Sequence, residues 1–195
     1  MIKTDTKTRK DRSRDKIVES AGCLMREKGI AATSVADVMD GAGMTVGGFY
    51  AHFHSKQDLV AETLASTIGQ SRKNLKEAAR GKHGAAAVRE MARSYLSRSH
   101  RDNPESGCPL PATAGELAGA DSALRQVLAD ELDASIRDIT AYLAEDGVEI
   151  ARGEAIADLA LMAGGLTLAR AVKGTDLSDE ILKACREHIK RSLPD

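Results

Sequence analysis

Residues 33–59 read Thr-Ser-Val-Ala-Asp-Val-Met-Asp-Gly-Ala-Gly-Met-Thr-Val-Gly-Gly-Phe-Tyr-Ala-His-Phe-His-Ser-Lys-Gln-Asp-Leu. We interpret this stretch as two short helices hinged at Gly43, with a third helix that begins directly after them. Glycine suits the left-handed backbone conformation that ends one helix and redirects the chain, because a Cβ atom would resist it. Two short helices joined by a tight turn have the layout of a helix-turn-helix motif.

Polar residues stand where each of these helices would begin. Ser34 is predicted to cap the first short helix, and Asp37, three residues later, makes an acidic variant of the capping box. Thr45 is predicted to cap the second short helix, and Ser55 the helix that follows. The pattern therefore predicts three helix starts within about twenty residues.

The aromatic residues of the second short helix divide into two faces. Phe49 and Phe53 lie one helical turn apart and are expected to pack inward. Tyr50 and His52 are then left to point away from that small core. An exposed phenol and imidazole at this place can donate hydrogen bonds to a partner.

Together these motifs resemble the TetR family of one-component transcriptional regulators. The matching motifs are Thr33-Ser34-Val35, Ala42-Gly43-Met44, Phe49-Tyr50-x-His52-Phe53 and Ser55-Lys56-x-x-Leu59. The similarity covers about fifty residues and ends at Leu59, and beyond that point it is only architectural. The resemblance implies a dimeric repressor that binds double-stranded DNA and responds to a small molecule, while activation rather than repression stays open.

The remainder of the chain has few β-branched alternations and much alanine and leucine, so we expect an all-α fold. We assign residues 1–54 to a three-helix helix-turn-helix DNA-binding domain with a basic N-terminal arm, 1–11. We assign residues 55–195 to a helical domain for ligand binding and dimerisation. The first short helix is expected to follow its cap Ser34 and to end at Gly43. The other expected helices cover about 12–28, 45–52, 56–80, 85–100, 112–118, 122–145, 154–173 and 178–192.

Composition narrows the functional class. Residues 3–16 hold seven basic side chains against three acidic ones, so the rest of this chain, of net charge -1, is acidic. Positive charge at one end suits a polyanion such as DNA.

No run of apolar residues approaches the length that a membrane span needs, and the charged N-terminus is unlike a secretory signal. Three cysteines without paired spacing favour neither disulfides nor zinc. We expect a cytoplasmic protein without metal or cofactor and without a membrane partner.

The resemblance assigns the DNA contacts. The second short helix, 45–52, would be the recognition helix, and its leading residues would meet base edges. Gly47 and Gly48 have no side chain, so they would serve close backbone approach, while Val46 offers apolar contact to a thymine methyl group. Ala36 departs from relatives that carry a polar side chain there. The predicted DNA-binding residues are Thr33, Ser34, Thr45, Val46, Gly47, Gly48, Tyr50, His52 and Lys56.

The C-terminal half is expected to regulate DNA binding. The last two helices are apolar on more than one face, which predicts a homodimer through them. A helix-turn-helix dimer predicts a palindromic operator, and the helix that begins at Lys56 would link the DNA to the regulatory core. Polar or polarisable residues on apolar helix faces are the candidate effector contacts: Met91, Tyr95, Cys108, Tyr142, Met162 and Arg170. With few aromatic residues in the chain, a small or aliphatic effector is favoured.

Cys108 raises a further hypothesis. It lies in a Gly-Cys-Pro-Leu turn near Arg98, His100 and Arg101, whose positive charge would favour the thiolate. Modification of this cysteine could then release the DNA, although a free cysteine also packs as a small apolar residue. Two alternatives stay open. One is a cysteine-dependent enzyme that pairs Cys108 with His83 or His100, and the other is an architectural protein that binds DNA without sequence preference.

Overall fold

The computed structural model describes residues 8–145, 147 and 152–193, and within them the chain is all-α. The helices are α1 (Arg9–Lys28), α2 (Val35–Gly41), η1 (Val46–Ala51), α3 (Lys56–Ala78), α4 (Gly84–Tyr95), α5 (Arg98–Asp102), η2 (Pro104–Ser106), α6 (Leu110–Leu117), α7 (Ser122–Glu145), α8 (Arg152–Ala171) and α9 (Asp176–Ser192). The expected fold class is confirmed.

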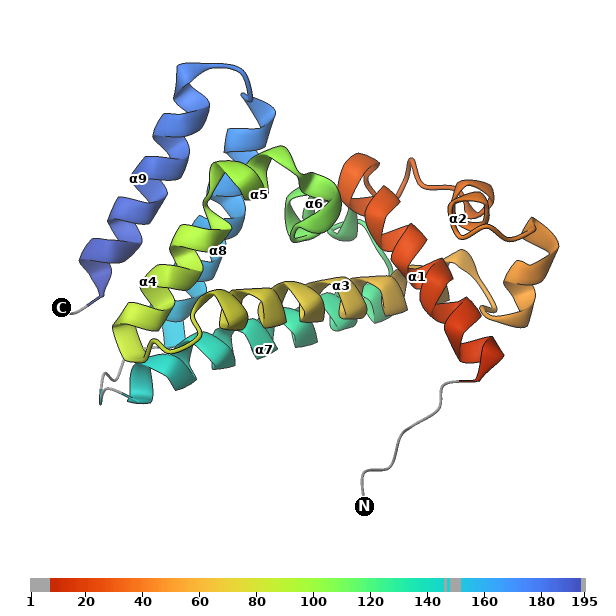
Figure 1. Cartoon of the computed structure of the whole chain (residues 1–195), viewed down its shortest axis with the longest axis horizontal. Helices are drawn as coiled ribbons and strands as arrows, with labels where there is room; N and C mark the ends of the chain where they lie inside the picture. The colour runs from red at the N-terminus through yellow and green to blue at the C-terminus, as the bar shows by residue number, and fades with distance from the viewer. Residues whose placement is uncertain (1–7, 146, 148–151, 194–195) are drawn as a thin grey trace.

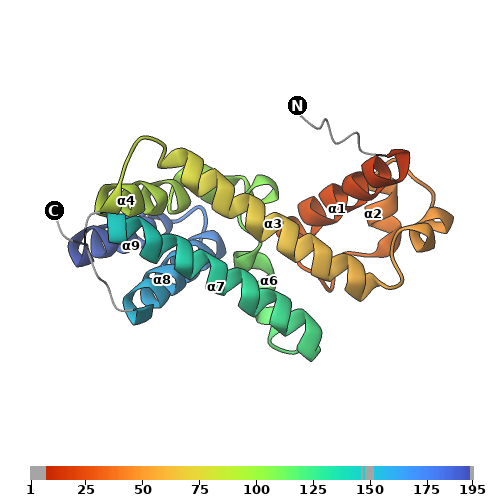
Figure 2. The same cartoon turned by 90° about the horizontal axis from the view of Figure 1, so that it is seen from below.

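The helices form a small head and a larger core (Figure 1). The head consists of α1, α2 and η1, and the core contains α4, α5, α7, α8 and α9. Helix α3 starts in the head and runs into the core, where α7 lies alongside it (Figure 2). Helix α6 sits between the two parts and packs on both α1 and α8.

The starts of α2, η1 and α3 follow the predicted caps with one exception. Ser34 and Asp37 form the full capping box of α2, and the Ser55 hydroxyl accepts a hydrogen bond from the Asp58 amide. Thr45 holds the N-cap position of the next helix, but its side chain makes no capping hydrogen bond. That helix is a 3-10 helix rather than the expected α-helix, because two adjacent glycines disfavour helical propagation. Gly43 has φ +69°, as the turn requires.

Two predicted boundaries differ from the structure by three residues or more. Helix α1 begins at Arg9, earlier than expected, because Thr8 and Asp11 form a capping box that the sequence interpretation overlooked. The helix expected to continue to His100 ends instead at Tyr95. Ser97 then caps the short helix α5 by accepting a hydrogen bond from the His100 amide. The break turns the chain so that α5 packs against α8.

Three hydrophobic clusters follow one another along α3. Leu59 is buried in the head cluster with Phe49 of η1 and with Phe53, which follows η1 in the chain. Leu64 belongs to a middle cluster that joins α1, α6 and α7, and Ile68 belongs to the large cluster of the core. A single rigid helix therefore takes part in the packing of every section of the molecule.

The turn between α1 and α2 is held from two sides. The Glu116 carboxylate of α6 accepts hydrogen bonds from the Ile30 amide at 3.0 Å and the Ala31 amide at 2.6 Å. The Lys56 ammonium donates to the Ile30 carbonyl at 3.0 Å. Gly29 starts this turn with φ +84°, and a Cβ atom there would lie 2.1 Å from a Glu116 carboxylate oxygen.

We expect Gly29→Ala to lower the free energy of unfolding by about 2–3 kcal/mol, because alanine is strained at this φ and displaces Glu116. Gly69→Ala is the matched control, since a Cβ atom at Gly69 meets open space in the helical backbone of α3. That control should gain about 0.5–1 kcal/mol. Urea denaturation measures both, and equal effects would contradict the proposed role of Gly29.

Candidate functional site

The η1 helix presents an exposed edge on the head. Tyr50 is 74% exposed and Val46 is 50% exposed, although both are large and at least partly apolar. Thr45 and Gly47 are exposed beside them. The backbone behind this edge is fixed, because Phe49 is buried and stacks on the ring of Phe53 at a centroid distance of 5.7 Å.

The predicted contact residues around this edge differ in availability. Ser34 is exposed at the start of α2, where its hydroxyl accepts the Asp37 amide. Lys56 is half-buried, and one N–H group of its ammonium is used by the Ile30 carbonyl. Thr33 is buried, and its hydroxyl donates to the Gly29 carbonyl at 2.7 Å. This burial and this hydrogen bond argue against a DNA contact by the Thr33 side chain, because the hydroxyl stabilises the turn.

Arg14 is the residue of the head whose role the sequence interpretation missed. It belongs to the basic run that we assigned to a polyanion, yet its guanidinium forms a bidentate ion pair with Glu62 of α3 and donates to the His52 carbonyl. The guanidinium carbon also lies 4.1 Å from the centre of the Phe53 ring. Arg14 of α1 therefore fastens the segment that follows η1 to α1 and α3, and a half-buried arginine paired in this way is a structural residue.

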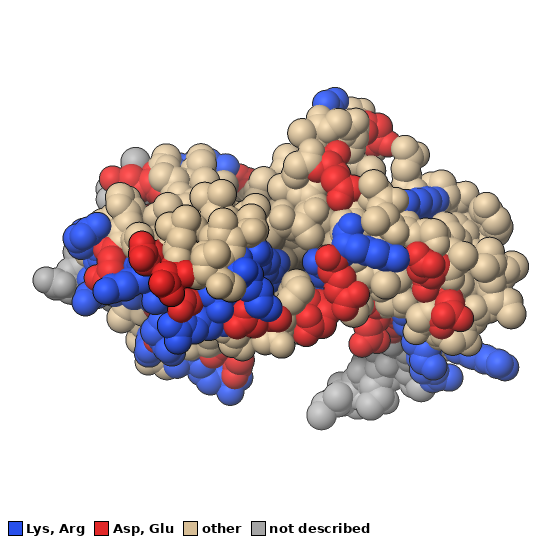
Figure 3. Space-filling model, turned by 90° about the horizontal axis from the view of Figure 1, so that it is seen from above, with Lys and Arg blue, Asp and Glu red and all other residues tan. Residues whose placement is uncertain are grey.

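Charge is mixed over the surface that Figure 3 shows. Lysine and arginine side chains lie among aspartate and glutamate side chains over both the head and the core, without a broad area of one sign. On the head, Asp37 beside the start of α2 is paired with Lys28 at 2.8 Å, which lowers the pKa of this carboxyl group. The Lys28 ammonium therefore offsets the negative charge of Asp37 close to the exposed edge of η1.

The core encloses a small cavity of about 50 Å³. Its wall is mostly apolar and comes from six helices, α3, α4, α6, α7, α8 and α9, and from the turn before α6. The lining residues are Ile68, Ser71, Arg72, Leu75, Lys76, Val88, Met91, Ala92, Tyr95, Cys108, Leu110, Ser135, Asp138, Ile139, Asp158, Leu159, Met162 and Ile189. Drug-sized ligands occupy several hundred Å³, so the cavity must widen before such a ligand enters.

Four of the six candidate effector residues line this cavity: Met91, Tyr95, Cys108 and Met162. Tyr142 and Arg170 do not line it. The Arg170 guanidinium instead donates to the His100 carbonyl at 2.7 Å and to the Arg101 carbonyl at 3.3 Å. Sequence spacing located the apolar face of each helix, but it could not reveal that the guanidinium of Arg170 binds backbone carbonyls of α5.

The electrostatic argument for a Cys108 thiolate was wrong. Cys108 is buried, and burial raises the pKa of its thiol, which nearby Tyr95 and Arg170 only partly offset. Arg98 and Arg101, expected to supply positive charge, are both paired with Asp179. A buried thiol with a raised pKa is less nucleophilic than an exposed cysteine at neutral pH.

His100 holds the Cys108 turn through its two ring nitrogens. Nδ1 lies 2.7 Å from the Tyr95 carbonyl, and Nε2 accepts a hydrogen bond from the Cys108 amide at 2.9 Å. Both nitrogens are used by backbone groups, so His100 is not placed to take a proton from the thiol. His83 pairs with Glu145 at an exposed site and does not line the cavity. Neither histidine supports the alternative of a cysteine-dependent enzyme.

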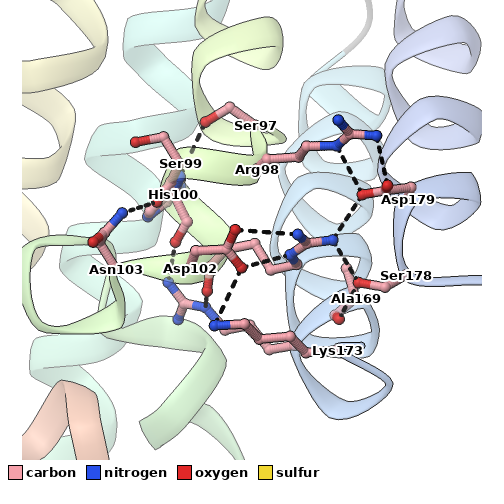
Figure 4. A network of polar contacts seen from close by, with 12 residues as sticks. Ser97, Arg98, Ser99, His100, Asp102, Asn103, Ala169, Lys173, Ser178 and Asp179 are labelled. Carbon is pink, nitrogen blue, oxygen red and sulfur yellow. Dashed lines mark hydrogen bonds and ion pairs between the residues drawn. The ribbon is translucent and has the colours of Figure 1, made fainter. Parts of the chain in front are cut away.

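A polar network ties α5 to α8 and α9 behind this turn (Figure 4). Asp179 binds Arg98 at 2.6 Å and Arg101 at 2.8 Å, and the Ser178 hydroxyl connects Arg101 to the Ala169 carbonyl. Asp102 binds Arg101 at 2.9 Å, and this ion pair helps hold the pKa of Asp102 at about 2. The network therefore holds α5 against α8 and α9. His100 of α5 in turn positions the Cys108 turn, which is part of the cavity wall.

An exposed, rigidly backed η1 helix in a three-helix head defines a helix-turn-helix DNA-binding protein. Residues 17–63 match the profile of bacterial regulatory proteins of the tetR family, and residues 84–188 match the LmrA/YxaF-like transcriptional regulator C-terminal domain. The chain belongs to the TetR family of transcriptional regulators. In the described part of the chain, no helix combines the length and hydrophobicity needed to cross a membrane.

Individual relatives are similar over different parts of the chain. The repressor KstR2 of Mycobacterium tuberculosis is 43% identical over 51 residues, which cover 26% of each chain. The match therefore spans only about a quarter of that curated relative. The regulator YfiR of Bacillus subtilis is 22% identical over 158 residues, 81% of this chain and 76% of YfiR.

Solved structures share the whole fold at low identity. A TetR-family regulator from Cytophaga hutchinsonii superposes with a TM-score of 0.79 at 21% identity, covering 97% of this chain and 98% of the other. The reduced form of Escherichia coli NemR superposes with a TM-score of 0.78 at 17% identity, covering 94% and 97%. At these identities the structures support the fold alone.

The position of His100 predicts a pH dependence of stability. Burial lowers the pKa of His100 below its ordinary value of 6.5, so the unfolded chain takes up this proton first as the pH falls. The stability is complete above pH 6.5 and declines below it. We expect the urea midpoint to fall between pH 7.5 and 5.5, and to fall less in His100→Gln. An identical decline in both proteins would contradict this assignment.

Proposed function

We propose that this regulator is a homodimeric repressor that binds a palindromic operator and is released by a small-molecule effector bound in the core. The observation that carries this proposal is α3, which lines the cavity through Ile68 and Leu75 and packs the head through Leu59. A ligand that widens the cavity acts on a helix whose first turn is part of the DNA-binding head.

At the DNA, we assign base contact to the leading end of η1 and phosphate contact to the residues around it. Val46 and the Thr45 methyl group would meet thymine methyl groups, while Gly47 and Gly48 allow close approach of the backbone. The proposed phosphate contacts are Ser34, Tyr50, His52 and the remaining N–H groups of Lys56. Phosphate contacts of this kind fix the register of the head without reading sequence.

Dimerisation is proposed through the outer faces of α8 and α9. Ile156 and Leu168 of α8 are 45% and 59% exposed, and Leu177 of α9 is 51% exposed. Small exposed residues, Ala160 and Gly164 among them, lie between the first two on the same face. This face is apolar and lets a second helix approach closely, which suits a twofold interface between two copies. Two heads held in this way would reach successive major grooves about 34 Å apart.

The effector would act by differential binding. A ligand shifts the regulator toward release only if it binds the released form more tightly than the DNA-bound form. The cavity of about 50 Å³ is smaller than an organic ligand, so occupancy favours a conformation in which α3, α4, α7 and α8 stand further apart. Modification of Cys108 is disfavoured as a release signal, because its thiol is buried.

Selection of duplexes from a random DNA pool tests the operator directly. The proposal predicts enrichment of one inverted repeat, bound by two protomers, with an affinity that falls steeply as salt rises. Equal affinity for random duplexes and for the enriched sequence would favour the alternative of an architectural protein.

Lys56→Ala should weaken binding to all duplexes by about tenfold and make the salt dependence shallower, because one phosphate contact per protomer is lost. Lys73→Ala is the matched control, since Lys73 lies on the exposed surface of α3 in the core. Fluorescence anisotropy over a salt series measures both variants. An unchanged affinity and slope in Lys56→Ala would remove Lys56 from the proposed contacts.

Ala160→Glu should convert the dimer to a monomer, because it places a charge in the apolar face of α8. Ala129→Glu makes the same change at an exposed position of α7 and should leave the dimer intact. Light scattering after size-exclusion chromatography gives the mass of each. A dimeric Ala160→Glu protein would place the interface elsewhere.

A further inference from the structure

The cavity wall carries charged groups that mostly neutralise one another. Arg72 of α3 pairs with Glu131 at 2.9 Å and with Asp138 at 3.4 Å. Lys76, one turn further along α3, pairs with Asp138 at 2.6 Å. Two cations thus face two carboxylates where α3 meets α7, and this part of the wall has no net charge.

Asp158 is the remaining charged residue of the wall, and it has no such partner. It lies on the inward face of α8 between Ala155 and Met162 and is 6% exposed. Within the described residues it makes neither a hydrogen bond nor an ion pair. Burial raises the pKa of its carboxyl group, an effect that Glu154 reinforces and His188 of α9 opposes. A buried carboxylate without a partner destabilises a protein, so a role in ligand binding would account for its presence.

We propose that the effector is an organic cation with a flexible apolar body, whose ammonium group binds the Asp158 carboxylate. The inference deepens the proposed function, and it rests on that function for the regulatory consequence of binding. The apolar body would contact residues such as Val88, Met91 and Leu159, which line the same cavity.

Other ligand classes fit this wall less well. An anion would meet the unpaired carboxylate and be repelled. A neutral ligand would displace water from Asp158 and leave its charge without a partner. A metal ion needs several ligands, and among the described residues no group of three or more histidine, cysteine or carboxylate side chains is placed to hold one. The small volume favours a chain that can thread between side chains over a rigid, wide ring system.

Three ligands of equal chain length separate these classes. Decylamine is cationic at pH 7.5, decanol is neutral and decanoate is anionic, and each is titrated below its micelle concentration into the full-length protein by isothermal calorimetry. We expect decylamine to bind at least about tenfold more tightly than either of the others. Decanol or decanoate binding as tightly as decylamine, or no binding of decylamine, would overturn the proposal.

Asp158→Asn tests the residue itself. The variant should lose about tenfold or more in decylamine affinity and bind decanol as before, because only the charge is removed. Asp130→Asn, an exposed carboxylate on α7, should behave as the unaltered protein. Unchanged decylamine affinity in Asp158→Asn would overturn the assignment.

Two further readouts separate this proposal from its alternatives. The melting temperature of Asp158→Asn should be equal to or above that of the unaltered protein, since an unpaired buried charge is gone. A lower melting temperature with unchanged preference for decylamine over decanol would instead make Asp158 a structural residue.

The binding of DNA duplexes is measured on the same protein samples. If decylamine binding depends on Asp158 but no duplex is ever retained, the proposed function fails while the ligand assignment stands.

Discussion

Leu59, Leu64 and Ile68 bury successive turns of α3 in three different hydrophobic clusters. The head is too small to form its core from α1, α2 and η1 alone, and it completes that core with the first turns of α3. The same helix then supplies one wall of the cavity. Because a helix is stiff over this length, the orientation of the head depends on how α3 packs in the core. The proposed coupling between effector binding and DNA release depends on that continuity.

A second connection runs beside α3 and acts on the turn between α1 and α2. Arg26 of α1 donates to the Glu105 carbonyl of η2 at 3.1 Å, and Glu116 of α6 binds two amides of the turn. Both α6 and the η2 segment adjoin Cys108, whose turn is fixed by His100 at the end of the cavity. The cavity therefore has two mechanical routes to the head, one through a helix and one through short, hydrogen-bonded segments.

The sequence predicted the head well because its signals are local. A cap such as Ser34, a glycine at a turn such as Gly43 and two phenylalanines one turn apart each act within a few residues. Long-range partners were not predictable: nothing in the spacing of Arg14 indicates Glu62, and the burial of Thr33 depends on how the turn folds. In the sequence, Asp158 is only a charged residue within the apolar stripe of a helix. Its position in the wall of the cavity is what suggests a role in ligand binding.

Native-state hydrogen exchange tests the central claim, that the head and the core share α3 as one cooperative unit, most directly. If the claim holds, amides around Ala21 of α1 and around Leu64 of α3 exchange through openings of the same free energy and respond equally to added urea. Exchange of the α1 amides through a separate, low-energy opening, while α3 beyond Leu64 stays protected, would contradict it.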